Sequence, residues 1–185
     1  MGGRGMMIEK ELSKISKEIF SSMRAGKHYS SSDGELYFLI EKYESELSEI
    51  FSAVGFELII NTLGFAYLNG HSDNLVNKKT IQKEAAFYFI FVQWLLEDGK
   101  NPTQCIKEQH IYSMNSLPHL SSGSNLDIMK AVEITNDADL NSLLKGLNKR
   151  GFINLKSDSF NLLAPSLRYI DLCYKIESVG RGEEE

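Results

Sequence analysis

The chain has 185 residues, 42% of them apolar, which is enough for a packed core in one ordinary domain or two small ones. The composition therefore argues against disorder for the bulk of the chain. The formal net charge of −5 excludes a surface that is electropositive throughout, and any nucleic-acid contact would need a local basic patch.

Cysteine usage and apolar run length indicate the compartment. Only Cys105 and Cys173 occur, and no secretory signal pattern precedes them, so we expect a cytoplasmic protein without a structural disulfide. The longest apolar stretch, Ala85 to Leu96, is about half of the ~20 residues that a membrane span needs, so we expect a buried helix and no membrane partner. Residues 1–7 are expected to be a flexible end or a cloning remnant.

Helical periodicity organises the first half of the chain. Residues 8–23 and 35–54 each carry an apolar stripe, which predicts one helix in each range. The inward side chains of the second helix would be Leu36, Leu39, Ile40, Tyr43, Leu47, Ile50 and Phe51. After Gly55 the pattern changes to two β-prone runs, Phe56–Ile60 and Phe65–Leu68, which are joined by turn residues and predict a hairpin.

A polar segment at 70–77 marks a boundary between two units. Beyond it, Lys79–Glu97 predicts a long helix that is apolar nearly all round, so it is buried on several sides or faces a second subunit. Asn101-Pro102 is a typical helix start and predicts a short helix through Ile106. The serine-rich stretch Ser113–Ser124 is expected to be a loop.

The clearest signal lies at 136–163, after a short helix expected at Leu126–Ile134. Asn136-Asp137 would cap a helix that Gly151 ends, and its inward side chains are Leu140, Leu143, Leu144 and Leu147. Two β-prone runs, Phe152–Leu155 and Phe160–Leu163, predict a second hairpin. Pro165 then opens a final amphipathic helix, with Leu167, Ile170, Leu172 and Ile176 inward.

The two halves share an order of elements. In each, a helix ends at a Gly-Phe pair that opens a hairpin, at Gly55-Phe56 and again at Gly151-Phe152. Helices followed by such a hairpin make the winged variant of the helix-turn-helix. We therefore predict a mainly α fold with short β-hairpins (α+β), arranged as tandem winged-helix domains. The domains would span 8–70 and 71–178, the second with extra helices, before a flexible tail at 179–185. The alternative from the pattern alone is a generic α+β domain with two hairpins.

Several segments in a fixed order carry a family resemblance. They are Arg24-Ala25-Gly26-Lys27-His28, Leu36–Phe51, Phe56–Ile59, Gly64–Leu68, and Leu147–Phe152 followed by Phe160 and a terminal helix. This series resembles the MukE/MksE family, the small accessory subunits of bacterial SMC condensins. The resemblance implies tandem winged-helix domains, a homodimer, and association with a kleisin subunit that bridges the heads of an SMC ATPase. It also implies a nucleoid-associated role in chromosome organisation and segregation, or in related plasmid defence.

Basic residues near the second hairpin are candidate DNA contacts. Residues 136–163 hold Lys145, Lys149, Arg150 and Lys156 against three aspartates, a local balance of +1. Such residues would meet phosphates and give weak, non-specific, salt-sensitive binding to double-stranded DNA. The alternative is that they simply complement the dipole at the helix end. Lys27 and His28, in the segment that matches the family, form either a further contact or a turn.

Two other sets of side chains are candidate protein contacts. Glu41 and Glu44 belong to an acidic face of the first unit, which would repel phosphate and is expected to meet a protein. The aromatic helix offers the dimer or core seam, and its candidate residues are Phe87, Phe89, Phe91 and Trp94.

The sequence holds no pattern that predicts an enzyme. Gly26-Lys27 lacks the glycine-rich stretch and the hydroxyl residue of a phosphate-binding loop. The histidines form no HExxH pair and the cysteines no CxxC, so we expect no catalytic residue, metal or cofactor. The alternative function is a stand-alone winged-helix transcription regulator that binds a defined duplex by itself.

Overall fold

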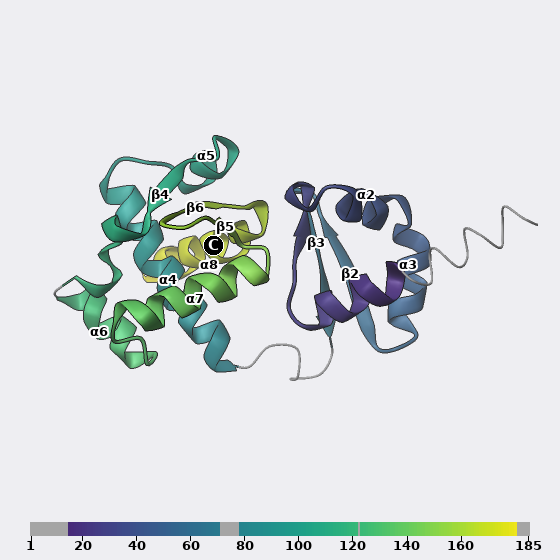
Figure 1. Cartoon of the computed structure of the whole chain (residues 1–185), viewed down its shortest axis with the longest axis horizontal. Coiled ribbons are helices and arrows are strands. Elements are labelled where there is room, and N and C mark those ends of the chain that lie inside the picture. The colour runs from purple at the N-terminus through teal and green to yellow at the C-terminus, as the bar shows by residue number, and fades with distance from the viewer. Residues whose placement is uncertain (1–14, 71–77, 122, 181–185) are drawn as a thin grey trace, which may run out of the picture. The chain divides into compact units, whose positions relative to one another are not determined.

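The computed structural model describes residues 15–70, 78–121 and 123–180, which divide into two compact units on either side of 71–77 (Figure 1). Both units mix helices with a small antiparallel sheet, so the predicted α+β class is confirmed. The expected flexible end at 1–7, the start of the helix expected at 8–23, and the segment 71–77 lie outside the described residues. No helix in the described ranges is long and apolar enough to cross a bilayer.

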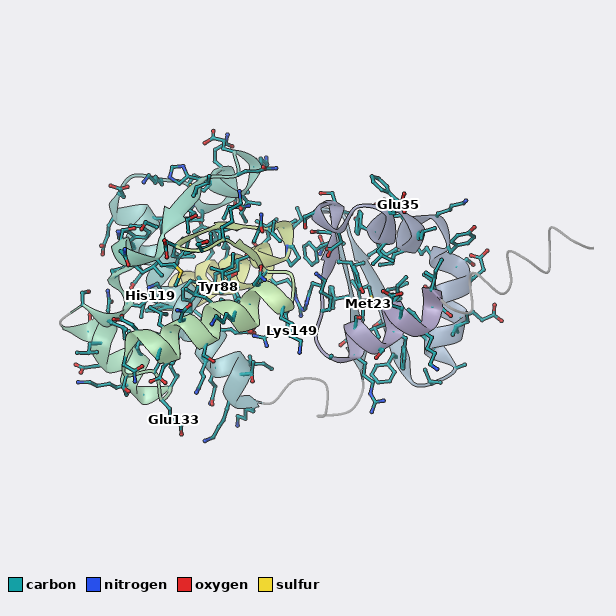
Figure 2. The ribbon with its side chains drawn as sticks, viewed as in Figure 1. Met23, Glu35, Tyr88, His119, Glu133 and Lys149 are labelled. Atoms are coloured by element: carbon teal, nitrogen blue, oxygen red, sulfur yellow. The ribbon has the colours of Figure 1, made fainter. Side chains whose placement is uncertain are left out.

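The first unit packs three helices against a three-stranded sheet. In chain order it contains a helix over 15–24, β1 (Tyr29–Ser30), a 3-10 turn (Ser31–Asp33), α2 (Glu35–Lys42), α3 (Glu44–Ser52), β2 (Phe56–Asn61) and β3 (Phe65–Gly70). The sheet order is β1-β3-β2, with Leu58 opposite Leu68 in the hairpin. The core is formed by Ile19, Met23, Tyr29, Tyr37, Ile40, Leu47, Phe51, Ala66 and Leu68, and Figure 2 labels Met23 within it.

The prediction of a single helix at 35–54 is wrong, because the helix is interrupted at Tyr43 and continues as a second one. The backbone of Tyr43 leaves helical geometry at φ −111° and ψ 31°, while its carbonyl still accepts from Leu47 N at 2.9 Å to start α3. The break redirects the second helix, so Leu47 and Phe51 are buried while Ile50 is 43% exposed. The expected inward position of Ile50 is therefore also wrong.

The second unit has the same kinds of layers with additional helices. It contains α4 (Lys78–Glu97), α5 (Pro102–Lys107), β4 (Ile111–Ser113), 3-10 turns (Met114–Ser116 and Pro118–Leu120), α6 (Ser124–Ala131), α7 (Asp137–Lys149), β5 (Ile153–Leu155), β6 (Ser159–Leu162), another 3-10 turn (Ala164–Ser166) and α8 (Leu167–Gly180). The sheet order is β4-β6-β5. The loop expected at Ser113–Ser124 is therefore partly wrong, because its first residue ends an edge strand and 3-10 turns follow.

Local chemistry explains both ends of α7. The Asn136 side chain accepts from Asp139 N at 3.0 Å, and the Asp139 carboxylate accepts from Thr135 N at 3.0 Å, so two otherwise orphaned donors are satisfied. At the other end, Gly151 adopts φ +80°, a conformation that favours glycine. The amide of the next residue, Phe152, then reaches back to Leu147 O at 3.0 Å and closes the helix.

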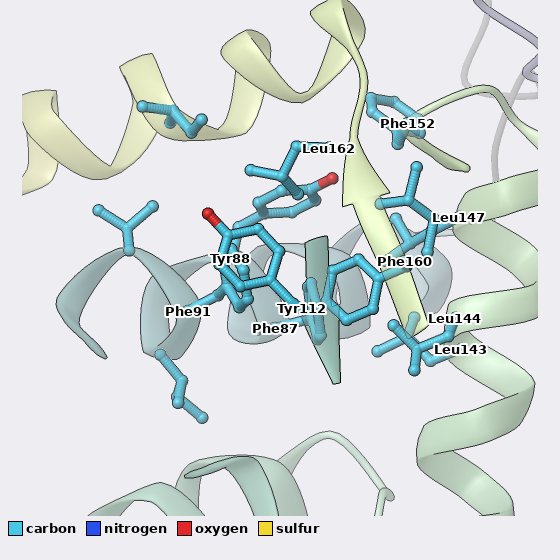
Figure 3. Packing of buried hydrophobic residues seen from close by; sticks show 14 of the residues in the cluster. Phe87, Tyr88, Phe91, Tyr112, Leu143, Leu144, Leu147, Phe152, Phe160 and Leu162 are labelled. Atoms are coloured by element: carbon cyan, nitrogen blue, oxygen red, sulfur yellow. The ribbon is translucent and has the colours of Figure 1, made fainter. Parts of the chain in front are cut away.

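An aromatic core fills the second unit (Figure 3). Phe91 lies edge-on to Tyr112 with centroids 4.9 Å apart, and 5.7 Å from Phe160 of β6, so α4 is fastened to the sheet. All four leucines predicted to face inward from α7 are buried. The last helix differs from the prediction, because Leu172 and Ile176 are 42% and 53% exposed and only Leu167 and Ile170 face the core as expected.

The two units place their elements in one order. Each runs helix, short strand, two helices and hairpin, and each pairs its first strand with its last, since β1 lies beside β3 and β4 beside β6. The second unit adds α5 before its first strand and α8 after its hairpin. A glycine with positive φ precedes each hairpin. The first hairpin begins one residue after Gly55 (φ +82°), and the second begins two residues after Gly151 (φ +80°).

Candidate functional site

The exposed edge formed by the end of α7 and the second hairpin carries three of the six predicted DNA contacts. Lys145 and Lys149 are exposed and stand four residues apart, hence on one face of α7. Lys156 is exposed in the hairpin turn, where its amide donates to Ser159 O at 2.7 Å. Figure 2 shows Lys149 at the carboxyl end of the helix. The backbone amide of Leu155 donates a hydrogen bond to the side-chain Oδ1 of Asn148 at 2.9 Å, which connects the hairpin to α7.

Arg150 is different from these lysines, because its guanidinium points inward. It forms an ion pair with Glu84 of α4, and the side chains are only 16% and 2% exposed. Burial lowers the pKa of Arg150 from its ordinary value, while guanidinium groups stay charged in proteins. The charge of Arg150 is thus neutralised inside the unit, and the exposed basic edge consists of Lys145, Lys149 and Lys156.

Two of the three aspartates of this region lie at the opposite end of α7, while the third, Asp158, is exposed in the hairpin turn near Lys156. Asp137 and Asp139 are in the first turn, where a carboxylate complements the helix dipole. Hydrogen bonds from the backbone and side chain of Thr135 hold the pKa of Asp139 below its ordinary value. Charge along α7 is therefore segregated, with its anions at the start and its lysines at the end.

The Gly26-Lys27-His28 element forms a connector in the first unit. Gly26 ends the helix over 15–24 with φ +89°, and the Lys27 ammonium lies 2.7 Å from the Asp33 carboxylate. His28 is 8% exposed, donates from Nδ1 to Gly26 O at 3.1 Å, and stacks on Tyr67 at 5.2 Å. Lys27 and His28 thus have internal partners that hold β1 in place, as a turn element would.

The acidic candidates lie on the surface of the first unit. Glu41 is exposed in the last turn of α2, and Glu44 is exposed in the first turn of α3. Burial, together with a hydrogen bond to Glu41, raises the pKa of Tyr37 to about 12. The first turn of α3 also holds Glu46, so its start offers a concentrated negative charge.

The aromatic candidates divide into two groups. Phe87 and Phe91 are fully buried in the core of the second unit, where their rings stack at 5.6 Å. Phe89 and Trp94 are only partly buried. A contact with a second copy through this helix stays a prediction. Of the four aromatic candidates, Phe89 and Trp94 are the two that keep some exposed surface.

Comparison with known proteins identifies the family. A family model described as condensin complex protein MksE matches residues 14–174, which includes both units. The chain belongs to the MksE family. Curated relatives are the chromosome partition proteins MukE of Vibrio vulnificus strains YJ016 and CMCP6, each 28% identical over 152 residues, 75% of this chain and 64% of theirs. MukE of Photobacterium profundum is 26% identical over 138 residues, 65% of this chain and 59% of its own.

The resemblance seen in the sequence is therefore confirmed at the level of the family. The alignments span less than two thirds of the curated MukE proteins, 64% and 59% of their lengths. Among the described residues of this MksE-family chain, no group of three histidine, cysteine, aspartate or glutamate side chains could hold a metal ion.

Sequence reasoning missed the buried polar residues of this MksE-family chain. Glu84 is 2% exposed within α4, and His119 is fully buried, with Nε2 donating to Phe87 O at 2.9 Å. A signal for Glu84 existed, because its spacing to Tyr88, Phe91 and Leu95 puts it on the inward stripe of the helix. For His119 no such signal existed, since it lies in the short 3-10 turn Pro118–Leu120, where the sequence shows no helical or strand periodicity.

Proposed function

We propose that this chain is a non-enzymatic accessory subunit of a bacterial SMC–kleisin complex, and that both of its units are winged-helix domains. The observation that carries the proposal is the match to the MksE condensin family through both units. The repeated order of helix, strand, two helices and hairpin supports the winged-helix assignment.

In this role the chain forms a homodimer and binds a kleisin, and through it an SMC ATPase that carries out the ATP chemistry. The complex acts in chromosome organisation and segregation or in plasmid defence, in association with the nucleoid. The names of the MukE relatives, chromosome partition proteins, support the first of these roles.

The two units supply different contacts. The acidic face with Glu41 and Glu44 binds protein, because it is exposed and repels phosphate. The exposed lysines at the end of α7 and in the hairpin touch the DNA backbone without reading sequence. Arg150, Lys27 and His28 are left out of the DNA contact, since their side chains are engaged within their own units.

Co-expression with a kleisin and an SMC ATPase from the same genome tests the assembly. We expect the full chain to co-purify with the kleisin as a dimer, measured by light scattering after size exclusion. Charge reversal by Glu41→Lys with Glu44→Lys should reduce recovery of the kleisin, whereas Glu108→Lys, an exposed change in the second unit, should not. A monomer that ignores both partners would contradict the proposal.

The dimer contact is tested on the aromatic helix. Phe89→Glu places a charge on its partly buried face and should yield monomers, while Gln93→Glu, at an exposed position of α4, should leave the dimer intact. Dimers that persist in the Phe89→Glu variant would exclude this face.

Gel shifts across a salt series separate a condensin subunit from a transcription regulator. We expect weak binding that is the same for unrelated duplexes, and each lysine lost should lower the salt slope by about 0.9 if it neutralises one phosphate. A regulator would instead bind one duplex roughly 10³-fold or more tighter than the others.

A further inference from the structure

A chain of buried polar groups holds the turn between α7 and the second hairpin. On one side of Gly151, Arg150 pairs with one carboxylate oxygen of Glu84 on α4. The other oxygen accepts from the Tyr169 hydroxyl of α8 at 2.5 Å. Because Glu84 is 2% exposed, the ion pair with Arg150 and the charge-assisted hydrogen bond from Tyr169 both form away from water, where such interactions are strong.

A second arm holds the other side of the same glycine. The hydroxyl of Ser166, itself fully buried, donates to the carbonyl of Phe152 at 2.6 Å. A serine hydroxyl has one proton, so the Tyr88 hydroxyl, 2.7 Å away, must be the donor in its bond to Ser166. The Phe152 carbonyl also accepts from Leu163 N at 2.9 Å, and both of its lone pairs are used.

Two stacked tyrosines join the arms. The rings of Tyr88 on α4 and Tyr169 on α8 lie 4.9 Å apart at an angle of 5°. Figure 3 shows Tyr88 and Phe152 within the same core. The residues on both sides of Gly151 are therefore fixed to α4 and α8, the helices on which α7 and the hairpin rest.

The winged order of elements does not itself require such a network. In the first unit the residue before the matching glycine is Val54, which is 58% exposed. A buried ion pair is also weak evidence for stability, since apolar side chains of similar volume are often as stable. Hydrogen bonds and ion pairs instead favour one defined geometry of the turn between α7 and the hairpin.

We propose that Glu84, Arg150, Tyr169 and Ser166 are positioning residues that set the direction of the second hairpin relative to α7. By fixing the turn, they let Lys149 and Lys156, which lie on its two sides, reach phosphates of one backbone together. The part that concerns DNA rests on the proposed function, whereas the positioning of the hairpin does not.

Distance measurements on the full chain test the positioning. Spin labels at Ala138→Cys on α7 and Ser157→Cys in the hairpin turn, both exposed sites, report the angle when the native cysteines are replaced by alanine. We expect a narrow distance distribution that broadens in Arg150→Met, Glu84→Gln and Ser166→Ala. Lys149→Met, an exposed neighbour, is the matched control and should keep it narrow.

A paired variant separates positioning from stability. Glu84→Leu combined with Arg150→Met removes both buried charges, so the chain should melt near the wild-type temperature, yet its hairpin distribution should stay broad. A wild-type melting temperature together with a narrow distribution would overturn the proposal.

DNA binding provides the second readout. Arg150→Met should weaken binding but keep the wild-type salt slope, because both lysines still reach phosphates in the bound state and only the fraction of free chains with the correct hairpin direction falls. Lys149→Met should lower the slope by about 0.9, the value of one lost phosphate contact. An equal drop in slope for Arg150→Met would make Arg150 a phosphate contact and overturn its positioning role. If the wild type binds no DNA, the proposed DNA contact fails, and the distance distributions still decide the role of the network.

Discussion

The two units differ most at the residue that precedes the hairpin glycine. In the first unit this residue is Val54, 58% exposed, whereas in the second it is Arg150, which is paired with the buried carboxylate of Glu84. The helices that end there differ as well, since α3 begins with glutamates and α7 ends with lysines beside its hairpin. The same order of elements thus carries an acidic surface in the first unit and a basic surface in the second. The buried Arg150–Glu84 pair lies next to the basic surface. The following changes test how far this difference extends.

The largest expected effect comes from the aromatic core. Phe91→Ala should destabilise the second unit by about 3–5 kcal/mol, because a fully buried ring leaves a cavity. The only tryptophan, Trp94, packs against Phe91 and reports unfolding of this unit in a urea titration. Amide exchange in β2 and β3 should stay at the wild-type rate, and faster exchange there would mean that the two units unfold together.

Arg150→Met should cost about 3 kcal/mol, since it leaves the carboxylate of Glu84 buried without its cation. The equivalent change in the first unit, Val54→Met, is at an exposed position and should stay within about 0.5 kcal/mol. Urea denaturation of both variants measures the contrast. Equal costs would remove the distinction between the two turns.

A pH titration of stability tests the buried histidine of the second unit. Burial lowers the pKa of His119 from 6.5 to about 4, so the folded state holds it neutral while the unfolded chain binds a proton. The contribution is fully present above pH 6.5 and is lost as the pH falls through about 4, about 3 kcal/mol in all. His119→Gln keeps a donor for Phe87 O, and its stability should change less over this range. The same slope in both would assign the effect to other groups.

The smallest effect concerns the helix that precedes the second hairpin. Asn136→Ala should cost about 1 kcal/mol, because the N-cap side chain accepts from Asp139 N, whereas α3 has no side-chain cap at all. Asn136→Asp keeps an acceptor and serves as the control in thermal melts. A loss as large in Asn136→Asp would point to a role other than capping.

Elements whose boundaries and buried face are encoded by nearby residues were predicted well. The helix at Asp137–Lys149 follows from the Asn136 cap, four leucines at helical spacing and Gly151, and all four leucines are buried. The second hairpin lies within a residue of its predicted runs. The family could likewise be predicted from the sequence alone, because the matching segments occur in a fixed order along the chain.

Features that depend on distant partners were missed. β1 and β4 have two and three residues, too few to show alternation, and they are strands only because β3 and β6 lie beside them. The break at Tyr43 has no glycine or proline to mark it. Arg150 looked like its basic neighbours, and only the fold reveals that Glu84, far away in the sequence, turns it inward.

The pairing of first strand with last has a consequence during synthesis. A ribosome delivers β1 well before β3, and β4 long before β6, so each sheet is completed only by the strand that its unit makes near its end. Because β3 and β6 are the central strands of their sheets, the other two strands of each sheet have no partner until that strand is made. All three strands of the first sheet are thus made before any strand of the second, which favours folding of the two units one after the other.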